Sequence, residues 1–150
     1  MNILFVCAGN TCRSCMAEAI FNHINDCDRF KALSAGVSAA KGSCTSKNAA
    51  GVVEYNAGLD ISKRAAVQLT EELIRKAQLV LAMTRGIKNH VAALFPDCKD
   101  KVFTLNEYVG VKGEISDPYG GDISVYNNTF IDLTEKIKLL LLKLKEDSSI

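Results

Sequence analysis

The sequence predicts a single α/β domain over residues 1–150, built on a four-stranded parallel sheet with helices on both faces. Four short apolar segments alternate along the chain with segments of helical periodicity, and this alternation favours parallel strands joined by helical crossovers. Residues 3–6 and 78–83 are almost uninterrupted apolar runs, which is typical of central strands buried on both sides. A chain of 150 residues is long enough to bury one core.

The first half of the chain contains two of the expected strands. The first strand is expected at residues 3–6, and an apolar stripe with helical spacing predicts a helix over 14–25. A short second strand follows at residues 30–35. The next helix should begin near Thr45 and end at Gly58, because a glycine just past a helix readily adopts the left-handed conformation.

The middle of the chain should supply the third strand and its flanking helices. Residues 59–68 are expected to be irregular, and Thr70 is expected to cap a short helix with an acidic first turn. The third strand follows at residues 78–83. The helix predicted over 84–95 should stop before Pro96, which cannot continue the backbone hydrogen bonding.

The last third of the chain should contain the fourth strand, a long loop and a final helix. The strand is expected at residues 101–105 and the loop at 106–121, and long loops in compact domains are usually functional or disordered. Either Asp122 or Ser124 should cap the final helix. The apolar stripe of that helix is formed by Tyr126, Phe130, Leu133, Ile137, Leu140 and Leu144.

The stretch between the first strand and the first helix concentrates the reactive groups. A strand that turns through a short polar loop into a helix directs several N–H groups at one spot and can hold a phosphate. Here Cys7 begins the loop and Arg13 ends it. Gly9 should let the backbone approach a bound phosphate closely, and Ser14 is expected to open the helix. A bound phosphate would therefore meet a nucleophile on one side and a guanidinium fork on the other.

The spacing of Cys7 and Arg13 is weak evidence when taken alone. With six cysteines and five arginines in 150 residues, an arginine six positions after some cysteine arises by chance about a fifth of the time. The preceding strand and the following helix make the pattern much more specific. The alternative is that Cys7 is a buried structural thiol and Arg13 a surface charge.

Two motifs at opposite ends of the chain carry a resemblance to a known family. Residues 6–14, Val-Cys-Ala-Gly-Asn-Thr-Cys-Arg-Ser, resemble the signature loop of the low-molecular-weight protein tyrosine phosphatases. The Asp117-Pro118-Tyr119 segment resembles the general-acid loop of that family, and residues 34–36 and 79–84 match it as well. The resemblance covers essentially the whole chain and implies the sheet order 2-1-3-4, with hydrolysis of phosphorylated protein side chains through a phosphocysteine.

The resemblance also implies a role for individual residues. Cys7 would be the nucleophile, Arg13 would hold the phosphoryl oxygens, and Asp117 would be the general acid and then the base. Asp-Pro commonly initiates a turn, so a purely local role for Asp117 is the alternative. The residues expected to contact the substrate are Ala8, Gly9, Asn10, Thr11, Cys12, Ser14 and Tyr119.

Four positions near the loop carry further expectations. Asn10 resembles the residue that braces the loop, and the hydroxyl of Ser14 should hydrogen-bond the thiolate, although ordinary loop and cap chemistry is compatible with both. Cys12 resembles the second loop cysteine, which can form a reversible disulfide with oxidised Cys7, and a small core thiol is the alternative. Cys15 replaces the usual proline, so it should loosen the first turn slightly and add a third thiol near the site.

Thr11 indicates which phosphorylated group is accepted. The tyrosine phosphatases of the family usually have a bulky aliphatic residue here, whereas the protein arginine phosphatases resemble this chain in having threonine. Residues 37–54 contain no aromatic side chain, and Tyr119 is followed by two glycines, so little aromatic stacking is available for a phosphotyrosine ring. Phosphoarginine is therefore favoured, with phosphotyrosine as the alternative.

Composition and charge restrict the remaining classes of function. The net charge of +1 gives no electrostatic footprint for nucleic acid or an anionic membrane, and the longest apolar runs are too short to span one. The N-terminal apolar run lacks the basic flank of a signal peptide, so we expect a cytoplasmic protein. Cysteines are usually reduced in a cytoplasm, so the six cysteines are expected to be thiols. Cys12 and Cys15 have no second pair or nearby histidine, and we expect neither a metal nor another cofactor.

Two other classes of protein have a similar thiol loop. An arsenate reductase needs two further cysteines downstream to resolve its intermediate, and only Cys98 lies beyond Cys44. A phosphocysteine carrier of a sugar transport system should lack both Arg13 and the acid, because it must keep its phosphate. A catalytically silent binding module is disfavoured because all the expected reactive groups are present. Phosphorylated proteins are thus expected as substrates and inorganic phosphate as product.

Overall fold

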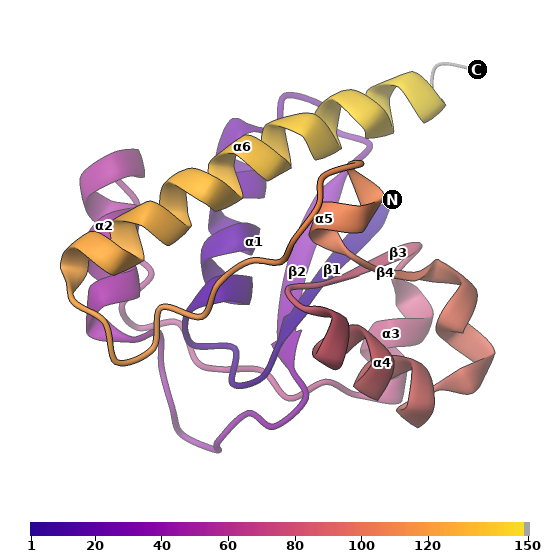
Figure 1. Cartoon of the computed structure of the whole chain (residues 1–150), viewed down its shortest axis with the longest axis horizontal. Coiled ribbons are helices and arrows are strands. Elements are labelled where there is room, and N and C mark those ends of the chain that lie inside the picture. The colour runs from indigo at the N-terminus through magenta and orange to yellow at the C-terminus, as the bar shows by residue number, and fades with distance from the viewer. Residues whose placement is uncertain (149–150) are drawn as a thin grey trace.

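The computed structural model describes residues 1–148 and is organised around a four-stranded parallel sheet in the order β2-β1-β3-β4 (Figure 1). The strands are β1 (Asn2–Cys7), β2 (Lys31–Gly36), β3 (Leu79–Ala82) and β4 (Val102–Thr104). In the register of β1 with β2, Cys7 lies opposite Gly36, so both strands end at the same edge of the sheet. The predicted fold class and strand order are confirmed.

Six α-helices and one 3-10 helix connect and cover the strands within residues 1–148. They are α1 (Arg13–Ile24), α2 (Lys47–Ala57), α3 (Glu71–Lys76), α4 (Arg85–Leu94), the 3-10 helix η1 (Pro96–Lys101), α5 (Leu105–Tyr108) and α6 (Ile123–Ser148). None of the helices described combines the length and the apolar character that a membrane-spanning helix needs.

The side chains of β1 alternate between two cores on opposite faces of the sheet. Ile3 and Phe5 join the larger core, which includes α1, α2 and α6, whereas Leu4 and Val6 join the smaller core with α3 and α4. Figure 1 shows α6 lying beside α1 and α2 on one side of the sheet, with α3 and α4 on the other. Burial on both faces is the reason that the sequence of this strand is continuously apolar.

The predicted caps and the predicted stripe of the final helix are confirmed. Gly58 ends α2 in the left-handed conformation at φ 68°, and the Thr70 side chain accepts a hydrogen bond at the start of α3. Asp122 accepts a hydrogen bond from the N–H of Val125 at the start of α6, so Asp122 and not Ser124 is the cap. All six residues of the expected stripe are buried against the sheet and its neighbouring helices.

Two predicted boundaries are wrong. The segment after β4 is not an unbroken loop, because Leu105–Tyr108 forms the short helix α5. Thr104 Oγ1 accepts a hydrogen bond from Glu107 N at 3.0 Å, and a carboxylate oxygen of Glu107 accepts one from Thr104 N at 2.7 Å. This reciprocal capping box stabilises a helix too short to show periodicity in the sequence. At α1, Cys12 is the N-cap and makes no side-chain capping bond, so Ser14 lies inside the first turn.

Candidate active site

The residues expected to carry the chemistry meet in one cavity beyond the carboxyl end of β1. The cavity has a volume of about 210 Å³. It is lined by Cys7, Ala8, Gly9, Thr11, Cys12, Arg13, Asp117 and Tyr119. The two remaining predicted residues, Asn10 and Ser14, are fully buried and bonded to the same loop. Ligands of parallel α/β sheets commonly bind at this edge.

Cys7 places its sulfur where polar groups surround it. The residue is 3% exposed, because it ends a central strand, yet it lines the cavity. Its Sγ lies 2.8 Å from Ser14 Oγ and accepts a hydrogen bond from Asn10 N at 3.3 Å. Asn10 Nδ2 donates to Ser14 Oγ at 2.8 Å, so the hydroxyl hydrogen of Ser14 is left for the sulfur. Both groups can donate a hydrogen bond to the sulfur.

The backbone of the loop turns its carbonyl groups away from the cavity. The carbonyl oxygens of Cys7, Ala8 and Thr11 accept hydrogen bonds from the segments that follow β2, at 2.9 to 3.0 Å. The N–H groups of Gly9 and Cys12 have no hydrogen-bond partner within residues 1–148. A loop with outward carbonyls and free N–H groups at a helix N-terminus is suited to holding the oxygens of a phosphate.

Asn10 gives the loop its shape. Its φ of 58° lies in the left-handed region, which costs a non-glycine residue about 1–2 kcal/mol. The side-chain amide compensates by donating to Ser14 and to Ser34 Oγ at 3.0 Å, and by accepting from Val67 N at 2.8 Å. The expectation that Asn10 braces the loop is therefore matched by four side-chain hydrogen bonds, of which the last comes from Arg64.

Gly36, at the end of β2, is the glycine that the loop requires. A Cβ at Gly36 would lie 2.5 Å from the carbonyl oxygen of Ala8 and 2.9 Å from the amide nitrogen of Asn10. At Gly9 the nearest atom to a Cβ would be Thr11 Oγ1, at 3.7 Å, which is an ordinary contact. The close approach of the backbone to a phosphate expected at Gly9 stays a prediction, and the tight contact within the protein is at Gly36.

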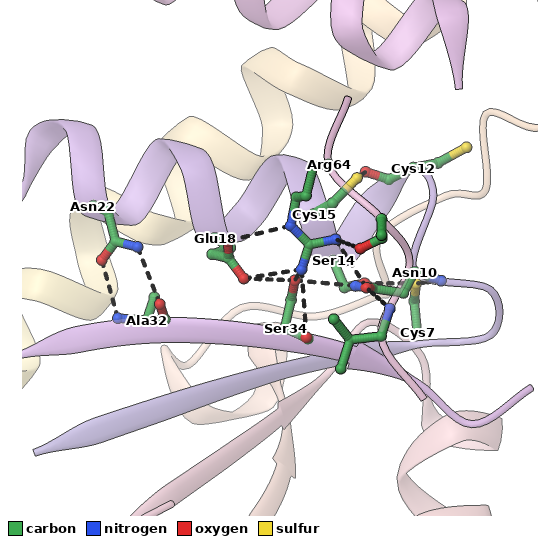
Figure 2. A network of polar contacts seen from close by, with 12 residues as sticks. Cys7, Asn10, Cys12, Ser14, Cys15, Glu18, Asn22, Ala32, Ser34 and Arg64 are labelled. Atoms are coloured by element: carbon green, nitrogen blue, oxygen red, sulfur yellow. Dashed lines mark hydrogen bonds and ion pairs between the residues drawn. The ribbon is translucent and has the colours of Figure 1, made fainter. Parts of the chain in front are cut away.

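Arg64 is a component of the site that the sequence did not reveal. Its guanidinium donates to Asn10 Oδ1 at 2.9 Å and to Ser34 Oγ at 2.7 Å, as Figure 2 shows. It also forms a two-point ion pair with Glu18 of α1, with N–O distances of 3.1 and 3.3 Å. The arginine thus links α1, β2 and the loop behind Cys7. It comes from an irregular segment without periodicity, so no pattern in a single sequence identifies it.

We expect Arg64→Met to lower kcat for the hydrolysis that the sequence predicts by about ten- to a hundredfold, because Asn10 would lose a partner and the loop would shift. KM should change much less, since Arg64 does not line the cavity. Steady-state kinetics measure both constants. Arg75→Met is the matched control, because Arg75 forms an exposed ion pair with Glu71 on α3. Equal kinetics for the Arg64 variant and the wild-type protein would contradict the positioning role.

Asp117 reaches the cavity from the other end of the chain. Arg13, whose side chain is 8% exposed, donates to the carbonyl oxygen of Ile115 at 3.1 Å, and its second terminal nitrogen lies 3.6 Å from Asp117 Oδ2. The other carboxylate oxygen of Asp117 accepts from Tyr119 N at 3.1 Å, so Asp117 also stabilises the local turn. Its side chain is 55% exposed, which leaves it accessible to a substrate in the cavity.

The cysteines near the loop have different environments. Cys12 lines the cavity, and its Sγ lies 3.4 Å from Ser46 Oγ and 3.5 Å from the Tyr126 hydroxyl. Cys15 is completely buried, donates to the carbonyl oxygen of Cys12, and does not line the cavity. Burial raises the pKa of the Cys15 thiol to about 12, so it stays protonated at neutral pH. All six cysteines are free thiols, and a Cys7–Cys12 disulfide stays a prediction.

Two observations bear on the alternative chemistries. Cys98 lies in η1, just before β4 begins, and is therefore at the opposite edge of the sheet from Cys7. It cannot serve in the thiol relay of an arsenate reductase without a large rearrangement. No group of three or more histidine, cysteine or acidic side chains among residues 1–148 is arranged to hold a metal ion.

Comparison with known proteins gives a consistent set of relatives. The family model described as low molecular weight phosphotyrosine protein phosphatase matches residues 2–150. A protein-arginine-phosphatase of Bacillus subtilis is 43% identical, with 98% of this chain and 99% of that protein aligned. The low molecular weight protein-tyrosine-phosphatase PtpB of Staphylococcus epidermidis is 38% identical over 92% of this chain and 97% of its own length.

A solved structure extends the comparison to three dimensions. It is the YwlE arginine phosphatase as a C7S mutant with a phosphorylated active site serine. It matches with a TM-score of 0.92 and 41% sequence identity, covering 98% of this chain and 97% of that one.

Proposed function

The chain belongs to the low molecular weight phosphotyrosine protein phosphatase family, and we propose that it is a protein-arginine phosphatase that works through a phosphocysteine on Cys7. The observation that carries the proposal is the single cavity that brings Cys7 and Arg13 together with Asp117. The relatives named as arginine phosphatases align over nearly the full length of the chain and support the choice of substrate. The substrates are then phosphorylated proteins and the product is inorganic phosphate.

In the first step, the Cys7 thiolate attacks phosphorus in line with the bond to the guanidinium nitrogen. The P–S bond forms as the P–N bond breaks, and Asp117 gives its proton to the departing guanidine. Arg13 and the free N–H groups of the loop hold the three equatorial oxygens. The solved relative with a phosphorylated serine at the nucleophile position supports phosphoryl transfer to position 7.

In the second step, water attacks the phosphorus of the phosphocysteine. The Asp117 carboxylate removes a proton from this water as the P–O bond forms and the P–S bond breaks. The sulfur leaves as a thiolate, stabilised by the Ser14 hydroxyl and by the N–H of Asn10. Phosphate departs, and the protein returns to its starting protonation state.

The lining of the cavity supports phosphoarginine over phosphotyrosine. Thr11 forms part of the wall, where a hydroxyl and a short side chain leave room for a planar guanidinium. Tyr119 is the one aromatic residue of the lining, and it is 83% exposed. A phosphotyrosine ring would therefore find an aromatic neighbour on one side at most, whereas a guanidinium can hydrogen-bond to the carboxyl group of Asp117.

Turnover of phosphoarginine and phosphotyrosine peptides of the same sequence tests the proposed substrate. We expect the wild-type protein to prefer phosphoarginine, and Thr11→Ile to move the ratio of the two kcat/KM values toward phosphotyrosine by about tenfold or more. Thr11→Val is the matched control, since it keeps the size of threonine without the hydroxyl. A wild-type preference for phosphotyrosine would contradict the choice of substrate, and an unchanged ratio in Thr11→Ile would contradict the role of Thr11.

The location in a cytoplasm and the absence of nucleic-acid and membrane partners stay predictions from the sequence. The disulfide between Cys7 and Cys12 also stays a prediction. It requires Cys12 to approach the oxidised Cys7 sulfur across the cavity that both residues line.

A further inference from the structure

A second cavity lies between α2 and the first turns of α6 and has no part in the chemistry above. Its volume is about 390 Å³. Its lining, which we call the α2–α6 groove, consists of Gly51, Val52, Tyr55, Ile123, Ser124 and Asn127. Tyr55 and Ile123 are 88% and 52% exposed, so the groove presents large apolar side chains to solvent.

The α2–α6 groove and the catalytic cavity share no lining residue, but one segment of the chain contributes to both. Tyr119, at the mouth of the catalytic cavity, is followed four residues later by Ile123, the first residue of α6. Asn48, in the first turn of α2, donates to the carbonyl oxygen of Gly121 at 3.4 Å and so links α2 to the segment that leads into α6. The segment that carries the acid therefore runs directly into the groove.

The substrate of the proposed function is a polypeptide, and this determines what passes over the groove. Its phosphoryl group must reach Cys7 at the base of the cavity, so its backbone crosses the mouth and its neighbouring side chains meet the rim. Exposed aromatic and aliphatic side chains beside a cavity are typical of surfaces that bind a partner. An apolar side chain of the substrate would bury itself against Tyr55 and Ile123 without leaving a charge unpaired.

We propose that the α2–α6 groove binds an apolar side chain of the phosphorylated polypeptide, near the phosphoarginine in its sequence. This inference rests on the proposed function and adds a determinant of substrate choice. The groove then contributes to the binding of peptides and not to that of free phosphoarginine, which has no neighbouring side chain to place in it.

Three variants test the groove in kinetics with two substrates, free phosphoarginine and phosphoarginine peptides with leucine placed in turn at each flanking position. Ile123→Ser removes one apolar wall. Gly51→Leu fills the groove, and the nearest atom to a Cβ at Gly51 is Ile123 Cδ1 at 3.6 Å, so the backbone tolerates the change. Leu142→Ser is the control, because Leu142 is an exposed apolar residue of the same helix, about 28 Å further along.

For the wild-type protein, leucine at one flanking position should raise kcat/KM by about tenfold, mainly through KM. Ile123→Ser and Gly51→Leu should abolish this gain and leave free phosphoarginine turnover unchanged, and Leu142→Ser should change neither. A wild-type kcat/KM that does not depend on flanking leucine, or variants that keep the gain, would overturn the groove proposal. So would a wild-type dimer in sedimentation that Ile123→Ser dissociates, because a second copy would then occupy the groove. Failure to turn over either substrate would instead overturn the proposed function.

Discussion

Cys7→Ser is expected to lower the turnover of phosphoarginine peptides by about ten-thousandfold or more, with little effect on folding. Serine has nearly the shape of cysteine and can keep the contacts with Ser14 and Asn10 N. Its hydroxyl is a far weaker nucleophile at neutral pH, and in the second step a serine alkoxide is a far poorer leaving group than a cysteine thiolate. Stopped assays of phosphate release measure the loss.

Cys15→Ser is the matched control for this change. Cys15 is buried in the first turn of α1 and does not line the cavity, and a serine hydroxyl can still donate to the carbonyl oxygen of Cys12. We expect its turnover to stay close to that of the wild-type protein. Wild-type turnover in Cys7→Ser would show that the sulfur takes no part in the reaction.

Asp117→Asn should lower kcat for phosphoarginine peptides by about a hundred- to ten-thousandfold, the contribution typical of a positioned general acid. A departing guanidine is strongly basic and needs a proton, which an amide cannot supply. The loss should be much smaller for an aryl phosphate whose phenol is acidic, because that leaving group departs without a proton in the first step. Parallel kinetics on the two substrates measure the difference.

Asp122→Asn is the control for the acid. Asp122 belongs to the same segment and caps α6 through a hydrogen bond from Val125 N, a role that asparagine performs equally well. Its hydrogen bonds from Ser124 and Val125 hold the pKa of its carboxyl below the usual range, so it is no proton donor at neutral pH. Equal losses on the guanidine and phenol leaving groups would contradict proton donation by Asp117.

The strands and the reactive loop were accessible from the sequence because each has a local signature. A continuously apolar run identifies β1, and the order of residue types from Cys7 to Ser14 predicts a loop suited to phosphate. Asp117 was predicted through the resemblance of Asp117-Pro118-Tyr119 to the general-acid loop of the family, since Asp-Pro alone equally indicates a turn. In these cases burial of a strand or the shape of a loop depends on consecutive residues, so it can be recognised in the sequence.

The parts that were missed depend on contacts between distant segments. Arg64 is 54 residues from Asn10 in sequence, and its partners Glu18 and Ser34 come from two other elements. The close packing of Gly36 under the loop likewise joins β2 to the end of β1. The short helix α5 is held by one capping box, which is too small a pattern to separate from a loop.

The most direct test of the proposed mechanism is to mix wild-type protein rapidly with a phosphoarginine peptide, stop the reaction within one turnover, and locate the phosphoryl group by mass spectrometry. We predict a transient phosphoprotein whose phosphoryl group is on the sulfur of Cys7 and which decays as phosphate appears. Release of phosphate with no phosphoprotein at any time, or a phosphoryl group found on another residue, would contradict phosphoryl transfer to Cys7.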